Sequence, residues 1–191
     1  MTSEYKLTLS PKTLNDAEPK AKAVLERAKA QLGFVPNMYA GMVNSPGLLE
    51  TYMDGYDRFR KDSGLTPAEQ EVVFLTISRF NGCDYCMAAH SVIADQMSKV
   101  PPAVTEAIRA GRTIADTKLA ALTRFTDTLL ATRGLPTKAD VLAFLGAGYE
   151  ERQVLEIILA IAVKTLSNYS NHLFHTPLDA MFTSREWKQS A

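Results

Sequence analysis

The sequence predicts an all-α protein, and three observations lead to this expectation. Signals for the start of a helix recur along the sequence. In each, Ser, Thr, Asp or Pro stands just before or at the beginning of a run of helix-forming residues. Gly or Pro follows most of these runs, where a helix would end. No series of alternating polar and apolar residues is bounded by hairpin turns. We therefore expect a compact bundle of about eight or nine helices.

We interpret the whole chain, residues 1–191, as a single helical domain. Residues 1–18 are polar and without a helical period, so we expect an irregular amino-terminal arm. The predicted helices span residues 18–32, 38–43, 46–61, 67–80, 83–97, 103–110, 117–133, 138–145 and 150–171. Residues 176–191 form a carboxy-terminal tail that carries the single tryptophan, Trp187.

The clearest helix start is Thr66-Pro67-Ala68-Glu69, a capping box with proline at the first helical position. The β-branched residues in 72–77 also suit a strand, but the capping box and the lack of other strand signals favour a helix. Ser45 is expected to cap the helix that begins at Pro46.

Composition limits the classes of function. Lys plus Arg and Asp plus Glu both number 21, so the net charge is zero and no basic stripe suggests nucleic acid or an anionic membrane as partner. No apolar run has the length of a signal peptide or membrane span, so we expect a cytoplasmic protein. In that reducing compartment we do not expect the two cysteines to form a structural disulfide. A closely spaced pair there is more often catalytic or half of a metal site.

Both cysteines fall in one stretch, as Cys83-x-x-Cys86, with His90 four residues later and Glu71 twelve residues earlier. Only the thiolate is a good nucleophile, and a helix start directs unpaired N–H groups and the positive end of the dipole toward sulfur. Asn81 and the glycine after it predict a sharp turn immediately before the pair. The stretch therefore predicts a dithiol/disulfide redox site.

The same stretch predicts a proton relay. Cys86 and His90 are four residues apart on one helix face, so the imidazole can take the thiol proton. If the two helices form an antiparallel hairpin, His90 lies level with residue 74, and Glu71 is roughly 4.5 Å further along at 1.5 Å per residue. Glu71 can then orient the imidazole and balance its charge.

Other interpretations of these residues remain open. The cysteines could be small buried apolar side chains, or could join His90 and Asp84 in a zinc site, although structural zinc sites need four ligands. His172 and His175 suit structural or interface roles near a helix end. We expect Trp187 to pack on a neighbouring subunit rather than bind substrate. A thioredoxin fold is unexpected, because the βαβ pattern around the cysteines is missing.

An internal similarity suggests a diverged duplication. At an offset of 84 residues, Cys83 and Cys86 align with Ser167 and Ser170, while Glu71 aligns with a leucine. A true duplication would let the two helix pairs superpose on each other.

The pattern Glu71-x11-Cys83-x2-Cys86-x3-His90 resembles the core motif of the AhpD-like, or carboxymuconolactone decarboxylase-like, family. The segments 33–37 and 81–86 are similar to its peroxidase-related branch. The resemblance implies an all-helical fold, a homo-oligomer (dimer, trimer or hexamer) and alkylhydroperoxide reductase activity. It makes Cys86 the peroxide-attacking thiol, Cys83 the resolving thiol, and His90 with Glu71 the relay.

The resemblance also implies partners, and it contains one departure. The substrate would be a peroxide and the reductant a dithiol or a lipoylated protein, with no metal or organic cofactor required. The alkylhydroperoxidase proper has a histidine where this chain has Tyr85, and a phenol with a pKa of about 10 cannot replace that base near neutral pH. Two alternatives remain: a decarboxylase-type enzyme acting on a small carboxylate, and a redox sensor or scaffold without turnover.

Overall fold

The computed structural model describes residues 3–189, and the prediction of an all-α fold is confirmed for this part of the chain. The helices are α1 (Pro19–Leu32), α2 (Asn37–Met42), α3 (Pro46–Asp62), α4 (Pro67–Phe80), α5 (Asp84–Gln96), α6 (Pro102–Ala110), α7 (Thr117–Ala131), α8 (Lys138–Gly146) and α9 (Glu151–Phe174). A 3-10 helix, η1 (Ala180–Arg185), lies in the tail and was not predicted. The α-helices begin and end within a few residues of their predicted positions.

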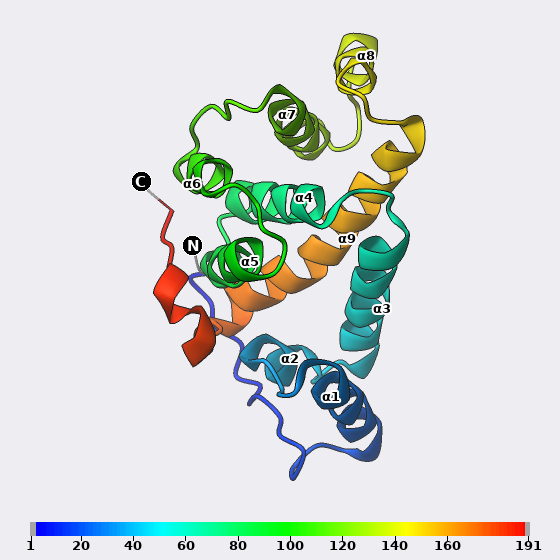
Figure 1. Ribbon diagram of the computed structural model, residues 1–191. Helices are drawn as coiled ribbons and strands as arrows, with labels where there is room; N and C mark the ends of the chain where they lie inside the picture. Colours follow the sequence, from blue (N-terminus) through cyan, green and yellow to red (C-terminus); the bar gives the residue numbers. More distant parts are fainter. Residues whose placement is uncertain (1–2, 190–191) are drawn as a thin grey trace.

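Helix α4 lies at the centre of the bundle, which explains its nearly continuous apolar sequence. Every residue from 69 to 78 is buried. Helices α5, α6, α7 and α9 pack around it, while α1, α2 and α3 lie beyond α9 in the lower part of Figure 1. A side chain on α4 is therefore shielded from water on nearly all sides, and any charge there requires a partner.

The capping signals in the sequence had mixed outcomes. Thr66 forms the predicted capping box, accepting a hydrogen bond from the Glu69 backbone while the Glu69 carboxylate accepts one from Thr66 N–H. Ser45 occupies the predicted N-cap position of α3, but its side chain makes no capping hydrogen bond. Pro46 at the first helical position already favours the helical backbone there.

The turn between α4 and α5 is a Schellman motif that sets the position of the cysteines. Gly82 has φ 66°, which suits a residue without a Cβ atom. Its N–H donates to Arg79 O at 3.0 Å, and Cys83 N–H donates to Ser78 O at 2.9 Å. Cys83 thereby becomes the N-cap residue of α5, and the chain reverses direction in two residues.

The suggested duplication is wrong for the helix pair. Residues 151–174 form one uninterrupted helix, α9, whereas the cysteine segment is a hairpin of two helices. The serine segment therefore has no turn at the position that corresponds to Asn81 and Gly82. The physical reason is local: the chain there has no glycine or proline to end the helix.

Two apolar clusters flank the α4–α5 hairpin. One is centred on α4, α6, α7 and α8 and contains Phe74 and Leu122. The other joins α1, α2 and α3 to α5 and contains both cysteines. The arm pairs its backbone with the end of α9, through Ser3 N–H to His172 O at 3.1 Å. No helix among residues 3–189 has the length and apolar character needed to cross a membrane.

Candidate active site

The two thiols lie together at the start of α5. Cys83 is fully buried and Cys86 is 2% exposed, and both are free thiols. Asn171 of α9 places its Nδ2 3.3 Å from the sulfur of Cys86 and 3.8 Å from that of Cys83. Ser167 Oγ lies 4.0 Å from the Cys86 sulfur. Helix α9 thus contacts the dithiol with two polar side chains.

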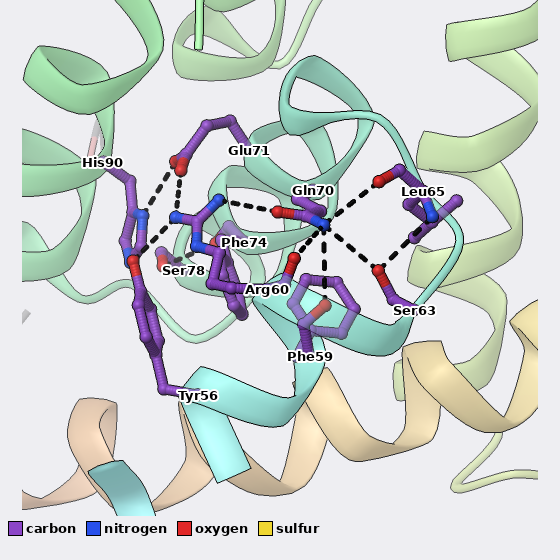
Figure 2. A network of polar contacts seen from close by, with 10 residues as sticks. All are labelled: Tyr56, Phe59, Arg60, Ser63, Leu65, Gln70, Glu71, Phe74, Ser78 and His90. Atoms are coloured by element: carbon purple, nitrogen blue, oxygen red, sulfur yellow. Dashed lines mark hydrogen bonds and ion pairs between the residues drawn. The ribbon is translucent and has the colours of Figure 1, made fainter. Parts of the chain in front are cut away.

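His90 and Glu71 meet as the hairpin geometry predicted. Glu71 Oε2 lies 2.8 Å from His90 Nδ1, and both side chains are buried. The His90 ring packs against Phe74, with centroids 4.9 Å apart, which is the level at which the hairpin model placed it. Figure 2 shows the two side chains facing each other between α4 and α5.

A second partner of Glu71 comes from α3. Arg60 forms an ion pair with Glu71 Oε1 and donates to the Tyr56 hydroxyl at 2.6 Å. Gln70 accepts from Arg60 Nη1 at 3.2 Å and donates to the backbone of Leu65 at 3.0 Å (Figure 2). The carboxylate of Glu71 therefore binds His90 through one oxygen and Arg60 through the other. The positive charge of Arg60 balances its negative charge.

Lys164 of α9 brings an unbalanced positive charge into the same region. Its side chain is fully buried, and its Nζ has no hydrogen-bond partner within ordinary geometric limits among the described residues. The Phe74 ring lies 5.6 Å from this nitrogen. A buried ammonium without an opposite charge has a high desolvation free energy. A nearby anion would therefore stabilise the Lys164 side chain.

The pKa values of the thiols are shifted in opposite directions. Burial alone would raise the pKa of Cys86, but the hydrogen bond with Cys83, the interaction with Lys164 and the electrostatic effect that His90 has when protonated lower it well below 9.0. Burial and the hydrogen bond to Cys86 raise the pKa of Cys83 well above that value. The causes at Cys86 are neighbouring side chains, one of which, Lys164, comes from α9.

The relay pair is poised as a carboxylate and a neutral imidazole. Burial would raise the pKa of Glu71, but His90 and Arg60 lower it overall. Burial and the charge of Lys164 lower the pKa of His90 below 6.5, despite the opposing effect of Glu71. Near neutral pH the ionised carboxylate accepts the Nδ1–H, which leaves Nε2 of His90 as a free base.

Cys86, His90 and Lys164 line one cavity of about 320 Å³. Its walls are mostly apolar and aromatic, including Tyr39 and Tyr52. Among the described residues, no hydrogen bond joins the Cys86 sulfur to the His90 ring, so the two groups share a cavity without direct contact. A substrate or water in this cavity can reach the thiol and the imidazole together.

Comparison with known proteins finds one family model and several solved structures that are similar to this chain. Residues 46–128, which contain α3 to α5 and all four predicted site residues, match the model of the carboxymuconolactone decarboxylase family. The chain has the AhpD-like fold, and its similarity to this family model extends over residues 46–128. No match was found among curated proteins.

Solved structures share the AhpD-like fold over nearly the whole chain. An uncharacterized peroxidase-related protein with an alkylhydroperoxidase AhpD core from Ralstonia eutropha JMP134 has a TM-score of 0.78 at 21% identity, covering 91% of this chain and 93% of that one. A peroxidase-related protein from Silicibacter sp. TM1040 has a TM-score of 0.74 at 20% identity, covering 94% and 97%. The debrominase Bmp8, solved as a cysteine-to-alanine variant with 2,3,4-tribromopyrrole, has a TM-score of 0.75 at 18% identity, covering 94% and 96%.

Tyr85, the departure from the AhpD pattern, contacts the tail. Its hydroxyl donates to Asp179 Oδ2 at 2.5 Å, and the other oxygen of Asp179 accepts from Asn37 N–H at 3.1 Å. Burial and Asp179 raise the pKa of Tyr85 above its ordinary value of 10. Tyr85 is therefore protonated near neutral pH and fastens η1 over the site.

The sequence analysis missed the residues that other helices contribute to this site. Lys164 carried a signal, because it is the one basic residue inside the apolar run VLEIILAIAVKTL of α9. Arg60 and Asn171 carried none, since polar residues at their positions suit an exposed helix face equally well. Helix packing alone brings these two side chains to the site.

Two other expectations can be compared with the geometry. Trp187 packs on its own chain, because its Nε1 donates to Arg109 O at 2.9 Å and its ring contacts the α4 cluster. Trp187 therefore contacts α6 of its own chain. Among residues 3–189 no group of three or more His, Cys, Asp or Glu side chains is arranged to hold a metal ion.

Proposed function

We propose that the protein is a thiol-dependent peroxidase in which Cys86 attacks the peroxide. One observation carries this proposal: the Cys86 thiol, with its lowered pKa, forms the wall of a cavity that also contains a neutral imidazole. A reactive cysteine requires this combination of thiolate character and access to a small substrate. The peroxidase-related proteins with the same fold agree with this chemistry.

The first step oxidises sulfur. His90 Nε2 takes the Cys86 proton through a water or the peroxide in the Cys86-lined cavity, and the thiolate attacks the terminal oxygen of ROOH. An S–O bond forms as the O–O bond breaks, so Cys86 becomes a sulfenic acid. The protonated His90 returns the proton to the leaving RO⁻, which departs as an alcohol. Glu71 stabilises the transient imidazolium, and Lys164 stabilises the thiolate.

The next steps restore the dithiol. The Cys83 sulfur attacks the Cys86 sulfenic acid, the S–S bond forms, and the thiol hydrogen and sulfenic hydroxyl leave as water. An external dithiol then reduces the disulfide and is itself oxidised. The hydrogen bond between the two thiols supports this assignment of Cys83 as the resolving residue.

The test is turnover of an organic hydroperoxide with a dithiol, comparing wild type with Cys86→Ser and Cys83→Ser. We expect Cys86→Ser to lose turnover, and Cys83→Ser to form a sulfenic acid that a dimedone probe traps. Full activity in Cys86→Ser would contradict the proposal. Disulfide formation without turnover would instead indicate a redox sensor, and peroxide-independent turnover of a carboxylate would indicate a decarboxylase.

The size of the cavity favours one further candidate, the reductive dehalogenation of a small aromatic compound. A cavity of about 320 Å³ with aromatic walls is larger than hydrogen peroxide requires. The debrominase Bmp8 has the same fold and was solved with a brominated pyrrole. The balanced reaction would be ArBr plus two thiols giving ArH, a disulfide and HBr. Release of bromide by wild type, without peroxide, would select this candidate.

A further inference from the structure

The two cysteines open onto different cavities. Cys86 lines the cavity of about 320 Å³ described above, which we call the Cys86 cavity. Cys83 lines a second one of about 120 Å³, which we call the Cys83 cavity. Among the described residues that line the two spaces, Tyr85 alone is shared. The dithiol thus lies in the wall between two separate approaches.

The walls of the two cavities differ in chemistry. The Cys86 cavity is mainly apolar, apart from His90 and Lys164. The Cys83 cavity has a larger polar share, and besides Cys83 and Tyr85 its charged or titratable residues are Asp84, His172, His175, Glu186 and Lys188. An organic hydroperoxide with an apolar body suits the first space, and a polar thiol suits the second.

His172 is an unused base in the Cys83 cavity. Its Nε2 is buried and has no hydrogen-bond partner among the described residues. Burial lowers the pKa of His172 below 6.5, so the ring is neutral near neutral pH. Asn171 Oδ1, on the same cavity, is a second buried acceptor without a partner there. A ligand with hydrogen-bond donors could form hydrogen bonds with both of these atoms.

The chemistry of disulfide exchange also distinguishes the two sulfurs. Exchange is faster when the departing thiol has the lower pKa. Here the pKa of Cys86 is lowered and that of Cys83 is raised. An incoming thiolate that attacks Cys83 expels the better leaving group, whose charge Lys164 then balances. The favourable point of attack therefore lies on the side of the smaller cavity.

We propose that the reductant enters through the Cys83 cavity and attacks Cys83, with His172 as the base that deprotonates its thiol. This inference rests on the disulfide cycle of the proposed function. The reductant is a small dithiol, or one carried on a slender arm, because the cavity holds about 120 Å³ and Cys83 is fully buried. The flat face of a folded redox domain could not bring its sulfur to this depth.

The exchange balances in two steps. The first reductant thiol gives its proton to His172 Nε2, and its sulfur bonds to Cys83 as the Cys83–Cys86 bond breaks and Cys86 leaves as thiolate. The second reductant thiol then attacks the sulfur of the first, forms the oxidised reductant and releases Cys83. Cys83 takes the proton from His172, and the proton of the second thiol passes to solvent or Cys86.

The test uses the full-length protein, oxidised to the disulfide by a chemical oxidant rather than by peroxide, so that it does not depend on peroxidase activity. Reduction by dithiothreitol is followed in wild type, His172→Gln and the matched control His175→Gln. His175 lines the same cavity, but its Nε2 already contacts Ser3 O at 2.7 Å. We expect His172→Gln to slow reduction at least about tenfold at neutral pH, with little change in the control.

A second measurement locates the attack. The oxidised protein is mixed with a monothiol and quenched in acid, and fragmentation mass spectrometry identifies the modified cysteine. We expect the adduct on Cys83. An adduct on Cys86, equal rates in His172→Gln and His175→Gln, or an equal slowing of peroxide oxidation by His172→Gln would overturn the inference. Failure of wild type to react with any peroxide would instead contradict the proposed function and leave this test intact.

Discussion

Glu71 and His90 lie 19 residues apart in the chain and meet with 2.8 Å between Oε2 and Nδ1, at the interface of α4 and α5. The same carboxylate binds Arg60 of α3 through its other oxygen. One buried acid therefore fixes the tautomer of a neutral base and neutralises the guanidinium of Arg60. The remaining cation of the site, Lys164, is free to balance the thiolate of Cys86.

Replacement of Glu71 by Gln separates the function of this pair from its contribution to stability. An amide offers one acceptor where the carboxylate offers two, so it cannot serve His90 and Arg60 together. We expect the rate of peroxide reaction to fall at least about tenfold, because the His90 tautomer is no longer fixed. We also expect a loss of about 3 kcal/mol in the free energy of unfolding, measured by urea denaturation.

The matched control for this change is Glu69→Gln, two residues earlier on α4. Glu69 pairs with Lys118 at 2.9 Å and caps α4, outside the thiol site. The Glu69→Gln variant should be less stable than wild type but should react with peroxide at the same rate. Equal rates for Glu71→Gln and Glu69→Gln would remove Glu71 from the relay.

Lys164 should influence the thiolate more than the fold. Replacement by Met removes a buried cation, and Cys86 can then become a neutral thiol, so we expect the free energy of unfolding to stay the same or rise by about 1 kcal/mol. The pKa of Cys86 should rise toward 9.0. The peroxide rate at neutral pH should then fall by about tenfold or more.

The measurement is the pH dependence of Cys86 alkylation in a Cys83→Ser background, for Lys164→Met and for Lys164→Arg. The Arg variant keeps the charge, so its alkylation profile should remain close to that of Lys164. An alkylation profile that is the same with Met, Arg and Lys would show that another group stabilises the thiolate.

The lowered pKa of His90 predicts how stability depends on pH. In the unfolded chain His90 takes up a proton near pH 6.5, whereas the folded protein binds it only at lower pH. Between these two pKa values the unfolded state therefore binds more protons than the folded state. The contribution of His90 to the stability of the fold is lost as pH falls below 6.5. Glu71 acts in the same direction below 4.5.

Urea denaturation from pH 8 to pH 5 checks this prediction, with His90→Asn as the comparison. The variant should lose less stability over the interval than wild type does. His175→Asn serves as the control, because its imidazole is far less buried than that of His90. A variant curve parallel to wild type would show that His90 takes up its proton at the same pH in the folded and the unfolded protein.

Tyr85 is expected to hold the tail rather than to transfer protons. Tyr85→Phe removes the hydrogen bond to Asp179 and should reduce stability by about 1–2 kcal/mol. Hydrogen exchange of the η1 amides should quicken, since η1 loses this link to α5. The peroxide rate should stay that of wild type, because the phenol is no base near neutral pH. A slower peroxide step with unchanged exchange in η1 would place Tyr85 in the relay.

The sequence by itself was enough to predict the helices and the α4–α5 hairpin. Capping boxes, prolines and glycines act on the nearest few residues, so their effects can be read without knowledge of the fold. The hairpin then places Glu71 beside His90, because the helical rise fixes which residues lie level on either side of Gly82. The four predicted site residues all belong to this locally determined unit.

The tertiary structure decided which groups from other helices complete the site. Arg60 comes from α3, and Lys164, Asn171 and His172 come from α9, which crosses the hairpin. The angle and register of a helix crossing depend on how whole surfaces of side chains interlock, and no short stretch of sequence specifies that packing. The charge that balances the Cys86 thiolate and the separate cavity beside Cys83 could therefore be seen only in the folded protein.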